Sequence, residues 1–357
     1  MAYDGENYYM KRFNSVLLKL LRESNGLTQE AFCHKYQFNQ ALLSQWERAI
    51  VAPSGEMTKK LAAVLRYPVD YLMQPMLDIP TGLVFHRKRS SLHVSLRTKI
   101  EARARLLAFD AIRICEACHI VPNLIQRNGM SPETAARELR QAWRIAKGPI
   151  GNLVAAMEQN GVIVLAFDFE TDLLDGFFLP AKTQPEFICI ALNTNATFSP
   201  DRQRFTLAHE LGHAILHRHE FPEMKAAEEE ANAFASEFLL PSKEVKKALA
   251  VPLTFTNLKN LKMTWGVSMG ALARRARDVE SATAAAYRRT CVFLSSCGYR
   301  KHEPDFGLKR ETPALVDGLM CSLLERGEDL DELLMLSPPR LSARYPNVFK
   351  GGTRMTG

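Results

Sequence analysis

Residues 199–217 have the sequence SPDRQRFTLAHELGHAILH, and this stretch decides how the rest of the chain is interpreted. Its apolar residues recur at helical spacing, and its opening Ser-Pro-Asp is typical of a helix start. We therefore expect one buried helix over the whole stretch. Inside it lies the pattern HExxH, which places His209 and His213 one turn apart on the same helical face.

This spacing of two imidazoles suits a single metal ion, and Glu210, beside the first histidine, can act as the general base of a zinc peptidase. Gly212, inside the motif, allows a neighbouring backbone to approach closely. We therefore predict metal ligands at His209 and His213 and a catalytic base at Glu210. A catalytic zinc site has three protein ligands and keeps one position for water, so another element must supply a third ligand.

A second helix after the motif is expected to supply it. This helix contains the run Glu228-Glu229-Glu230 and ends just before Pro241. Glu228 shares a helical face with Asn232, one turn further on, and is the predicted third ligand. Glu229 and then Glu230 remain as alternatives.

Two further histidines follow the motif. His219 has the spacing of the longer motif HExxHxxGxxH, but Leu216 stands where that motif needs glycine for a sharp turn. His217 continues the helical face of His209 and His213. It is interpreted as a residue that supports the site or lies on the surface.

The N-terminal part of the chain, residues 13–74, shows five short helical patterns separated by polar turns. The stretches LTQEA at 27–31 and LSQWER at 43–48 resemble the helix-turn-helix of the Cro/lambda-repressor type. In that family the third helix enters the major groove of DNA. The resemblance implies a phosphate contact by Gln29 and base contacts by Gln40, Ser44 and Gln45. The alternative is a helical module that binds protein.

Composition limits the remaining choices. A chain of 357 residues is expected to form two to three domains. The net charge of +7 favours an anionic partner such as DNA, and seven Lys or Arg residues against one Glu lie between His86 and Arg105. Seven scattered cysteines fit a reducing compartment. With neither a signal-peptide pattern nor a membrane-spanning stretch in the sequence, we expect a cytoplasmic protein with no membrane partner.

A small sheet is predicted before the HExxH helix, with strands near 162–167, 174–178 and 187–193. Zinc peptidases commonly hold an extended substrate against an edge strand of such a sheet. The last strand, 187–193, is the predicted substrate edge.

The middle of the chain, from about residue 82 to residue 305, resembles the ImmA/IrrE family of metallopeptidases. The resemblance is carried by Phe85-His86-Arg87, Gly148-Pro149-Ile150, Arg204 to His213, Glu228 to Pro241, Trp265 to Leu272 and Gly298 to Pro304. A helix-turn-helix in front is a common arrangement in that family. The resemblance implies zinc-dependent proteolysis of a transcriptional repressor, in a regulated setting such as a stress response. It also implies His209, His213 and Glu228 as ligands, with Glu210 as the general base.

The predicted fold is α+β and mainly helical. A five-helix helix-turn-helix domain occupies 1–78, and a zincin-like peptidase domain with a small sheet occupies 79–250. A helical region follows at 251–357, with a second helix-turn-helix-like segment at 261–278 that is expected to pack within the peptidase rather than read DNA.

The predicted function is that of a zinc endopeptidase of the gluzincin type, which cleaves a repressor or antitoxin-like protein and binds DNA. One Zn²⁺ per chain is expected, with Mn²⁺ or iron as alternatives in the cell. The alternative is a DNA-binding regulator whose metal site senses or stabilises. The intact Glu210 argues against that alternative, because a structural metal site does not need a base.

Overall fold

A computed structural model of the chain describes residues 13–75, 92–125, 129–180, 186–218, 223–300 and 302–349. The chain forms two compact units, each assembled from separate segments. Unit 1 combines residues 1–78, 93–119 and 316–357, and unit 2 combines residues 79–92 and 120–315. The helical C-terminal region expected at 251–357 is therefore shared between the two units.

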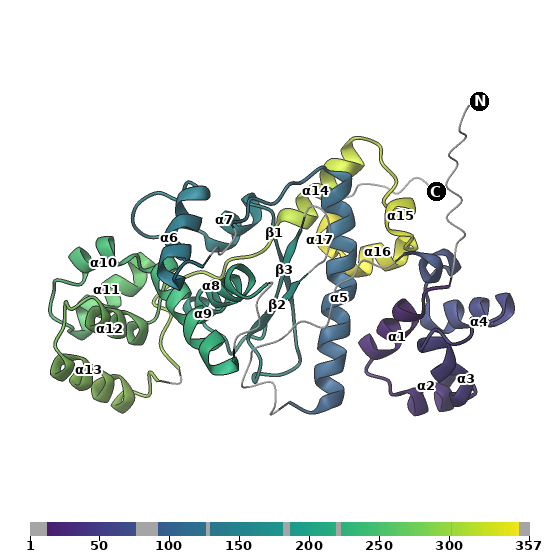
Figure 1. Ribbon diagram of the computed structural model, residues 1–357, viewed down its shortest axis with the longest axis horizontal. Helices are drawn as coiled ribbons and strands as arrows, with labels where there is room; N and C mark the ends of the chain where they lie inside the picture. Colours follow the sequence, from purple (N-terminus) through teal and green to yellow (C-terminus); the bar gives the residue numbers. More distant parts are fainter. Residues whose placement is uncertain are drawn as a thin grey trace. The chain divides into compact units, whose positions relative to one another are not determined.

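Unit 1 begins with the five elements predicted for a helix-turn-helix domain (Figure 1). They are α1 (Ser15–Ser24), α2 (Gln29–Tyr36), α3 (Gln40–Glu47), α4 (Gly55–Leu65) and the 3-10 helix η1 (Val69–Met73). The side chains of Thr28, Asn39 and Ser54 cap the N-termini of α2, α3 and α4, which explains why each helix begins where it does. The last of these five elements is a 3-10 helix and not an α-helix.

The rest of unit 1 comes from the middle and the end of the chain. These elements are α5 (Val94–Ala117), α14 (Leu315–Glu325), α15 (Leu330–Leu334), α16 (Pro338–Arg344) and α17 (Pro346–Phe349). Their buried residues share one hydrophobic core with those of α1 to η1, so the helix-turn-helix is part of a larger folded body.

Unit 2 contains the predicted small sheet together with several helices. Its helices are α6 (Pro132–Ala142), α7 (Leu153–Gln159), α8 (Pro200–Leu216), α9 (Met224–Leu239), α10 (Ser242–Ala248), α11 (Phe255–Trp265), α12 (Met269–Asp278) and α13 (Ala284–Ser296). The segment with a second helix-turn-helix appearance falls in α11 and α12. Trp265, Met269 and Leu272 from these two helices are buried in the core of unit 2.

The sheet has three strands, β1 (Val162–Phe167), β2 (Gly176–Pro180) and β3 (Ile188–Asn193), in the order β1-β3-β2. β3 pairs in parallel with β1 and antiparallel with β2. Its backbone is thus hydrogen-bonded on both sides, and the prediction that 187–193 offers a substrate edge is wrong. Within the sheet as described, the edges are β1 and β2, and α8 packs against β2 and β3.

The helix that decides the fold, α8, has the predicted extent. Ser199 occupies its N-cap position and Pro200 its first turn, although the Ser199 side chain makes no capping hydrogen bond. Gly212 allows α9 to approach closely. A Cβ at this position would lie 3.0 Å from Phe234 Cδ1 and 3.2 Å from the Ala231 carbonyl oxygen, so the missing side chain leaves room for the neighbouring helix.

The described helices include none that is both long and apolar enough to cross a bilayer. The α+β, mainly helical fold class is confirmed. Two sequence features, the Phe85-His86-Arg87 stretch in the basic region and the alternative ligand His219, lie outside the described residues.

Candidate metal centre

α8 and α9 together carry the candidate ligands. His209 and His213 lie one turn apart on α8 with 6% and 1% of their surface exposed, and their Nε2 atoms are 3.0 Å apart. The Glu228 carboxylate of α9 faces both rings, with oxygens 3.7 Å from His209 Nε2 and 3.5 Å from His213 Nε2. All three donor atoms lie within 4.8 Å of one another.

The chemistry of this cluster fits a divalent cation. A tetrahedral zinc ion bound to nitrogen and oxygen at its usual bond lengths separates its ligand atoms by about 3.3 Å. The observed separations of 3.0, 3.5 and 3.7 Å scatter around that value. Two imidazole nitrogens that face each other at hydrogen-bond distance repel through their lone pairs unless a proton or a cation lies between them. Two histidines and one carboxylate are the ligand set of several catalytic zinc sites.

The three consecutive glutamates point in three directions, because successive residues of a helix are rotated by about 100°. Glu228 faces His209 and His213. Glu229 is exposed and lines a neighbouring cavity, and the Glu230 carboxylate lies 2.8 Å from Nε2 of His217. The structure therefore brings only the first of the three to the histidine pair.

The other nitrogen of each candidate ligand also has a partner. Nδ1 of His209 lies 3.1 Å from the side-chain oxygen of Asn232 on α9. Nδ1 of His213 lies 3.0 Å from Nδ1 of His217, the residue that ends α8. Such contacts fix the rotation of each ring and leave its Nε2 directed at the cluster.

Glu210 is 1% exposed, and its carboxylate is bound by a backbone group of the sheet. Its Oε2 accepts a hydrogen bond from the backbone N–H of Phe178 in β2, at 3.0 Å. The predicted general base therefore lies between the HExxH helix and an edge strand.

Buried ion pairs anchor the N-terminal half of α8. Lys262 of α11 is fully buried, and its ammonium lies 3.1 Å from Asp201 and 2.7 Å from Glu303. Arg204 pairs with Glu311 and donates to the Ile150 carbonyl at 2.7 Å. The Asp201 carboxylate therefore binds a lysine in addition to lying near the positive end of the helix dipole.

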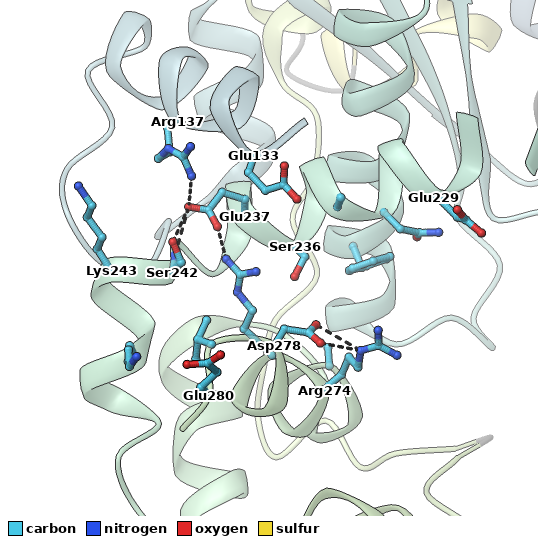
Figure 2. A pocket seen from close by; sticks show the side chains of 17 residues that line it. Glu133, Arg137, Glu229, Ser236, Glu237, Ser242, Lys243, Arg274, Asp278 and Glu280 are labelled. Atoms are coloured by element: carbon cyan, nitrogen blue, oxygen red, sulfur yellow. Dashed lines mark hydrogen bonds and ion pairs between the residues drawn. The ribbon is translucent and has the colours of Figure 1, made fainter. Parts of the chain in front are cut away.

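A cavity of about 1000 Å³ opens beside the cluster, between α6, α9, α10 and α12 (Figure 2). Two of its lining residues lie next to His209: the side-chain oxygen of Asn232 is 3.1 Å from its Nδ1, and the Phe205 ring centroid is 6.5 Å from that of His209. A second cavity of about 690 Å³ shares Phe205 and Ala271 with it and is also lined by Arg202 and Tyr287. Arg202 pairs with Asp175, so its charge is already compensated.

The wall of the larger cavity contains a buried carboxylate. Glu237 is 1% exposed, pairs with Arg275 and Arg137, and accepts hydrogen bonds from the backbone N–H and the hydroxyl of Ser242, as Figure 2 shows for the labelled residues. Burial by itself disfavours its charged form. The attraction of Arg275 and the bonds from Ser242 outweigh burial and hold the pKa of Glu237 below its ordinary value of 4.5.

The candidate DNA contacts lie on α2 and α3 of unit 1. Gln40 is exposed at the start of α3, while Ser44 and Gln45 are half-buried in its middle. The Gln29 amide donates a hydrogen bond of 2.8 Å to Glu47, which is also paired with Arg22. That internal bond was not foreseen in the sequence, where Gln29 was interpreted only as a phosphate contact.

The fold and the His-His-Glu cluster define a metallopeptidase-like domain joined to a helix-turn-helix domain. Comparison with protein families gives the same two assignments. Residues 157–277 match the IrrE N-terminal-like domain of the M78 peptidase family, and residues 18–72 match a helix-turn-helix family. The chain therefore carries an IrrE N-terminal-like domain and a helix-turn-helix domain, as the sequence motifs indicated. No curated protein matches the chain as a relative.

Two features of the site could not be found from the motif. The bond between Phe178 and Glu210 involves a backbone N–H, which leaves no signal in the sequence. The contact of Glu230 with His217 had a weak signal, since His217 continues the face of His209 and His213 and three glutamates were available to meet it.

Proposed function

We propose that the chain is a zinc-dependent endopeptidase that cleaves a protein substrate, with a transcriptional repressor or an antitoxin-like protein as the expected class. The observation that carries this proposal is the arrangement of Glu210 beside the His209, His213 and Glu228 cluster. His209, His213 and Glu228 would hold one Zn²⁺ and, as three protein ligands, would leave room for a water on the metal.

A zinc ion in such a site supplies an acidified water and polarises the carbonyl of the scissile bond. Glu210 accepts the proton of the attacking water and then delivers it to the leaving amine nitrogen. The hydrogen bond from Phe178 orients the Glu210 carboxylate, and its burial keeps competing water away. The same contact places the edge strand β2 next to the base, so the substrate backbone is expected to extend along β2.

We further propose that the N-terminal domain binds DNA. Gln40 is exposed where α3 would enter the major groove, and Ser44 and Gln45 follow one turn later. A glutamine amide carries two hydrogens, so the bond to Glu47 fixes the Gln29 side chain and leaves a second hydrogen for a phosphate. Such contacts release counterions, so the affinity is expected to fall steeply with salt.

The substitution Glu210→Gln tests the peptidase proposal. It removes the base and keeps the size of the side chain, so the variant should retain about one Zn²⁺ per chain and lose cleavage by a factor of at least about 10². The measurement is the appearance of new protein N-termini, by mass spectrometry, after incubation of a cell extract with the zinc-loaded chain. A regulator whose metal site only senses or stabilises would give the same N-termini with both proteins.

Metal content assigns the third ligand in the same experiment. Glu228→Ala should lose the zinc, whereas Glu229→Ala should keep it, because the Glu229 side chain is turned away from the histidines. Zinc lost in the second variant alone would assign the ligand to Glu229. Zinc retained in both variants would show that neither Glu228 nor Glu229 of α9 is a ligand.

A further inference from the structure

The C-cap residue of α8 carries a third buried imidazole that the proposed reaction does not use. His217 lies one turn after His213 and has 1% of its surface exposed. Its two ring nitrogens make two different contacts. Nδ1 lies 3.0 Å from Nδ1 of His213, and Nε2 lies 2.8 Å from the carboxylate of Glu230.

We propose that His217 and Glu230 form a hydrogen-bonded relay that orients His213 for metal binding, so that both are positioning residues. This inference rests on the proposed role of His213 as a ligand. The geometry of the relay, however, depends only on the contacts of these three side chains.

When both rings are neutral, each ring nitrogen of the relay either carries a hydrogen and donates it or keeps a lone pair and accepts. His213 Nε2 faces the candidate metal position, between His209 and Glu228, and must keep its lone pair there. Its Nδ1 therefore carries the hydrogen and donates it to Nδ1 of His217. His217 then carries its own hydrogen on Nε2 and donates it to Glu230, whose carboxylate can only accept.

The relay makes the two histidine ligands unequal. The hydrogen on His209 Nδ1 goes to the neutral amide oxygen of Asn232. The hydrogen on His213 Nδ1 goes through a second imidazole to a negative charge. A carboxylate at the end of such a chain fixes the tautomer and raises the basicity of the ligand, which strengthens its bond to a metal. Glu230 is partly exposed, with 28% of its side chain accessible, so this charge avoids the cost of full burial.

The test is the zinc affinity of the full-length chain, freed of metal and titrated with Zn²⁺ in competition with a chromogenic chelator. His217→Phe keeps an aromatic ring and loses both hydrogen bonds, and Glu230→Leu removes the terminal acceptor. Loss of such a supporting partner typically weakens metal binding by about 10- to 100-fold, and we expect a loss in this range for both variants. His217→Asn places an oxygen near the position of Nδ1 and should restore part of the affinity.

Two controls separate positioning from general damage. Glu229→Gln removes a neighbouring charge that is directed elsewhere, and its zinc affinity should equal that of the unchanged chain. The visible absorption bands of bound Co²⁺ should change in His217→Phe, because the His213 ring is then free to rotate. A purely structural role would leave those bands unaltered while the metal-free protein melted at a lower temperature.

The outcomes distinguish this inference from the proposed function. Zinc binding by the unchanged chain, with equal affinity in His217→Phe and Glu230→Leu, would overturn the relay and leave the metal site intact. Failure of the unchanged chain to bind zinc would overturn both. Should His217→Phe fail to fold, Glu230→Leu alone decides, because its side chain lies at the edge of the site.

Discussion

At the scale of single residues, unit 2 depends on a buried carboxylate that lies apart from the candidate metal cluster. Glu237 compensates Arg275, which is itself 8% exposed, and joins α9 to α12 and to the start of α10. Glu237→Gln leaves the guanidinium without its charge partner. Removal of one member of a buried pair costs about 3–5 kcal/mol, and we expect a loss of unfolding free energy in that range near neutral pH.

The pH dependence of this loss follows from the lowered pKa of Glu237. Because the carboxyl is more acidic in the folded chain than in the unfolded one, its stabilising effect is present above about 4.5 and is lost as the pH falls through the folded-state value. Urea unfolding at neutral pH and near pH 3 measures this. The difference in unfolding free energy between the unchanged chain and Glu237→Gln should be smaller at the lower pH. Glu280→Gln, an exposed site on the rim of the same cavity, should change stability by less than about 0.5 kcal/mol. If that difference in unfolding free energy stayed constant with pH, the ion pair of Glu237 with Arg275 would be contradicted.

At the scale of elements, the contact between α8 and α9 decides whether the ligands meet. Gly212→Val would push a side chain against the Ala231 backbone and the buried Phe234 ring, neither of which can yield without moving α9. We expect a destabilisation of about 1–3 kcal/mol together with weaker zinc binding, because Glu228 moves with α9. Gly270→Ala in α12 is the matched control, since its nearest neighbour would lie 3.9 Å from the new Cβ. The measurements are urea unfolding and zinc titration, and wild-type affinity in Gly212→Val would show that α9 does not set the ligand geometry.

The same contact shows how far the sequence alone reaches. The spacing of His209 and His213 is local, so the helical period was sufficient to place both on one face. The choice among three glutamates depended on where α9 begins and how it crosses α8. The structure starts that helix at Met224, one turn before the acidic run, a position that apolar periodicity does not define.

The order of the strands lay beyond the sequence for a similar reason. All three strands were predicted close to their observed positions, because each is a short apolar run bounded by turn residues. Their order depends on a parallel crossover between β1 and β3, and no local pattern encodes it. The prediction of the substrate edge failed at that step, whereas the helix-turn-helix, built from consecutive local elements, was predicted nearly complete.

At the scale of the whole molecule, the N-terminal helices and the last described helices fold into the same unit. Leu334 and Leu341 from the last helices are fully buried in the core that also contains Leu17 and Leu21 of α1. The helix-turn-helix is thus completed by residues about 300 positions away in sequence, a long-range pairing that must form before the unit is stable.

Polar contacts strengthen this packing of the last helices against the N-terminal ones. The Arg340 guanidinium donates to the carbonyls of Leu65, at 2.6 Å, and Arg66, at 2.9 Å, at the end of α4. Arg344 pairs with the fully buried Asp110 of α5 and donates to the Tyr67 hydroxyl at 2.6 Å. The last helices therefore bind both α5 and the helix-turn-helix through charged side chains as well as apolar ones.

Removal of residues 316–357 should accordingly impair DNA binding, although no predicted DNA contact lies in that segment. The deletion exposes the core of unit 1, so amide hydrogen exchange in α1 and α3 should rise and salt-dependent DNA binding should be lost, while the zinc content stays unchanged.

Arg344→Met tests the same packing of the last helices with one substitution. This substitution leaves the buried Asp110 carboxylate without its charge partner, which should lower the free energy of unfolding by about 3–5 kcal/mol. The double variant Asp110→Leu with Arg344→Met should recover much of that loss, because two apolar side chains replace the ion pair. Unchanged exchange in α1 and α3 after the deletion would mean that the N-terminal helices fold without the end of the chain.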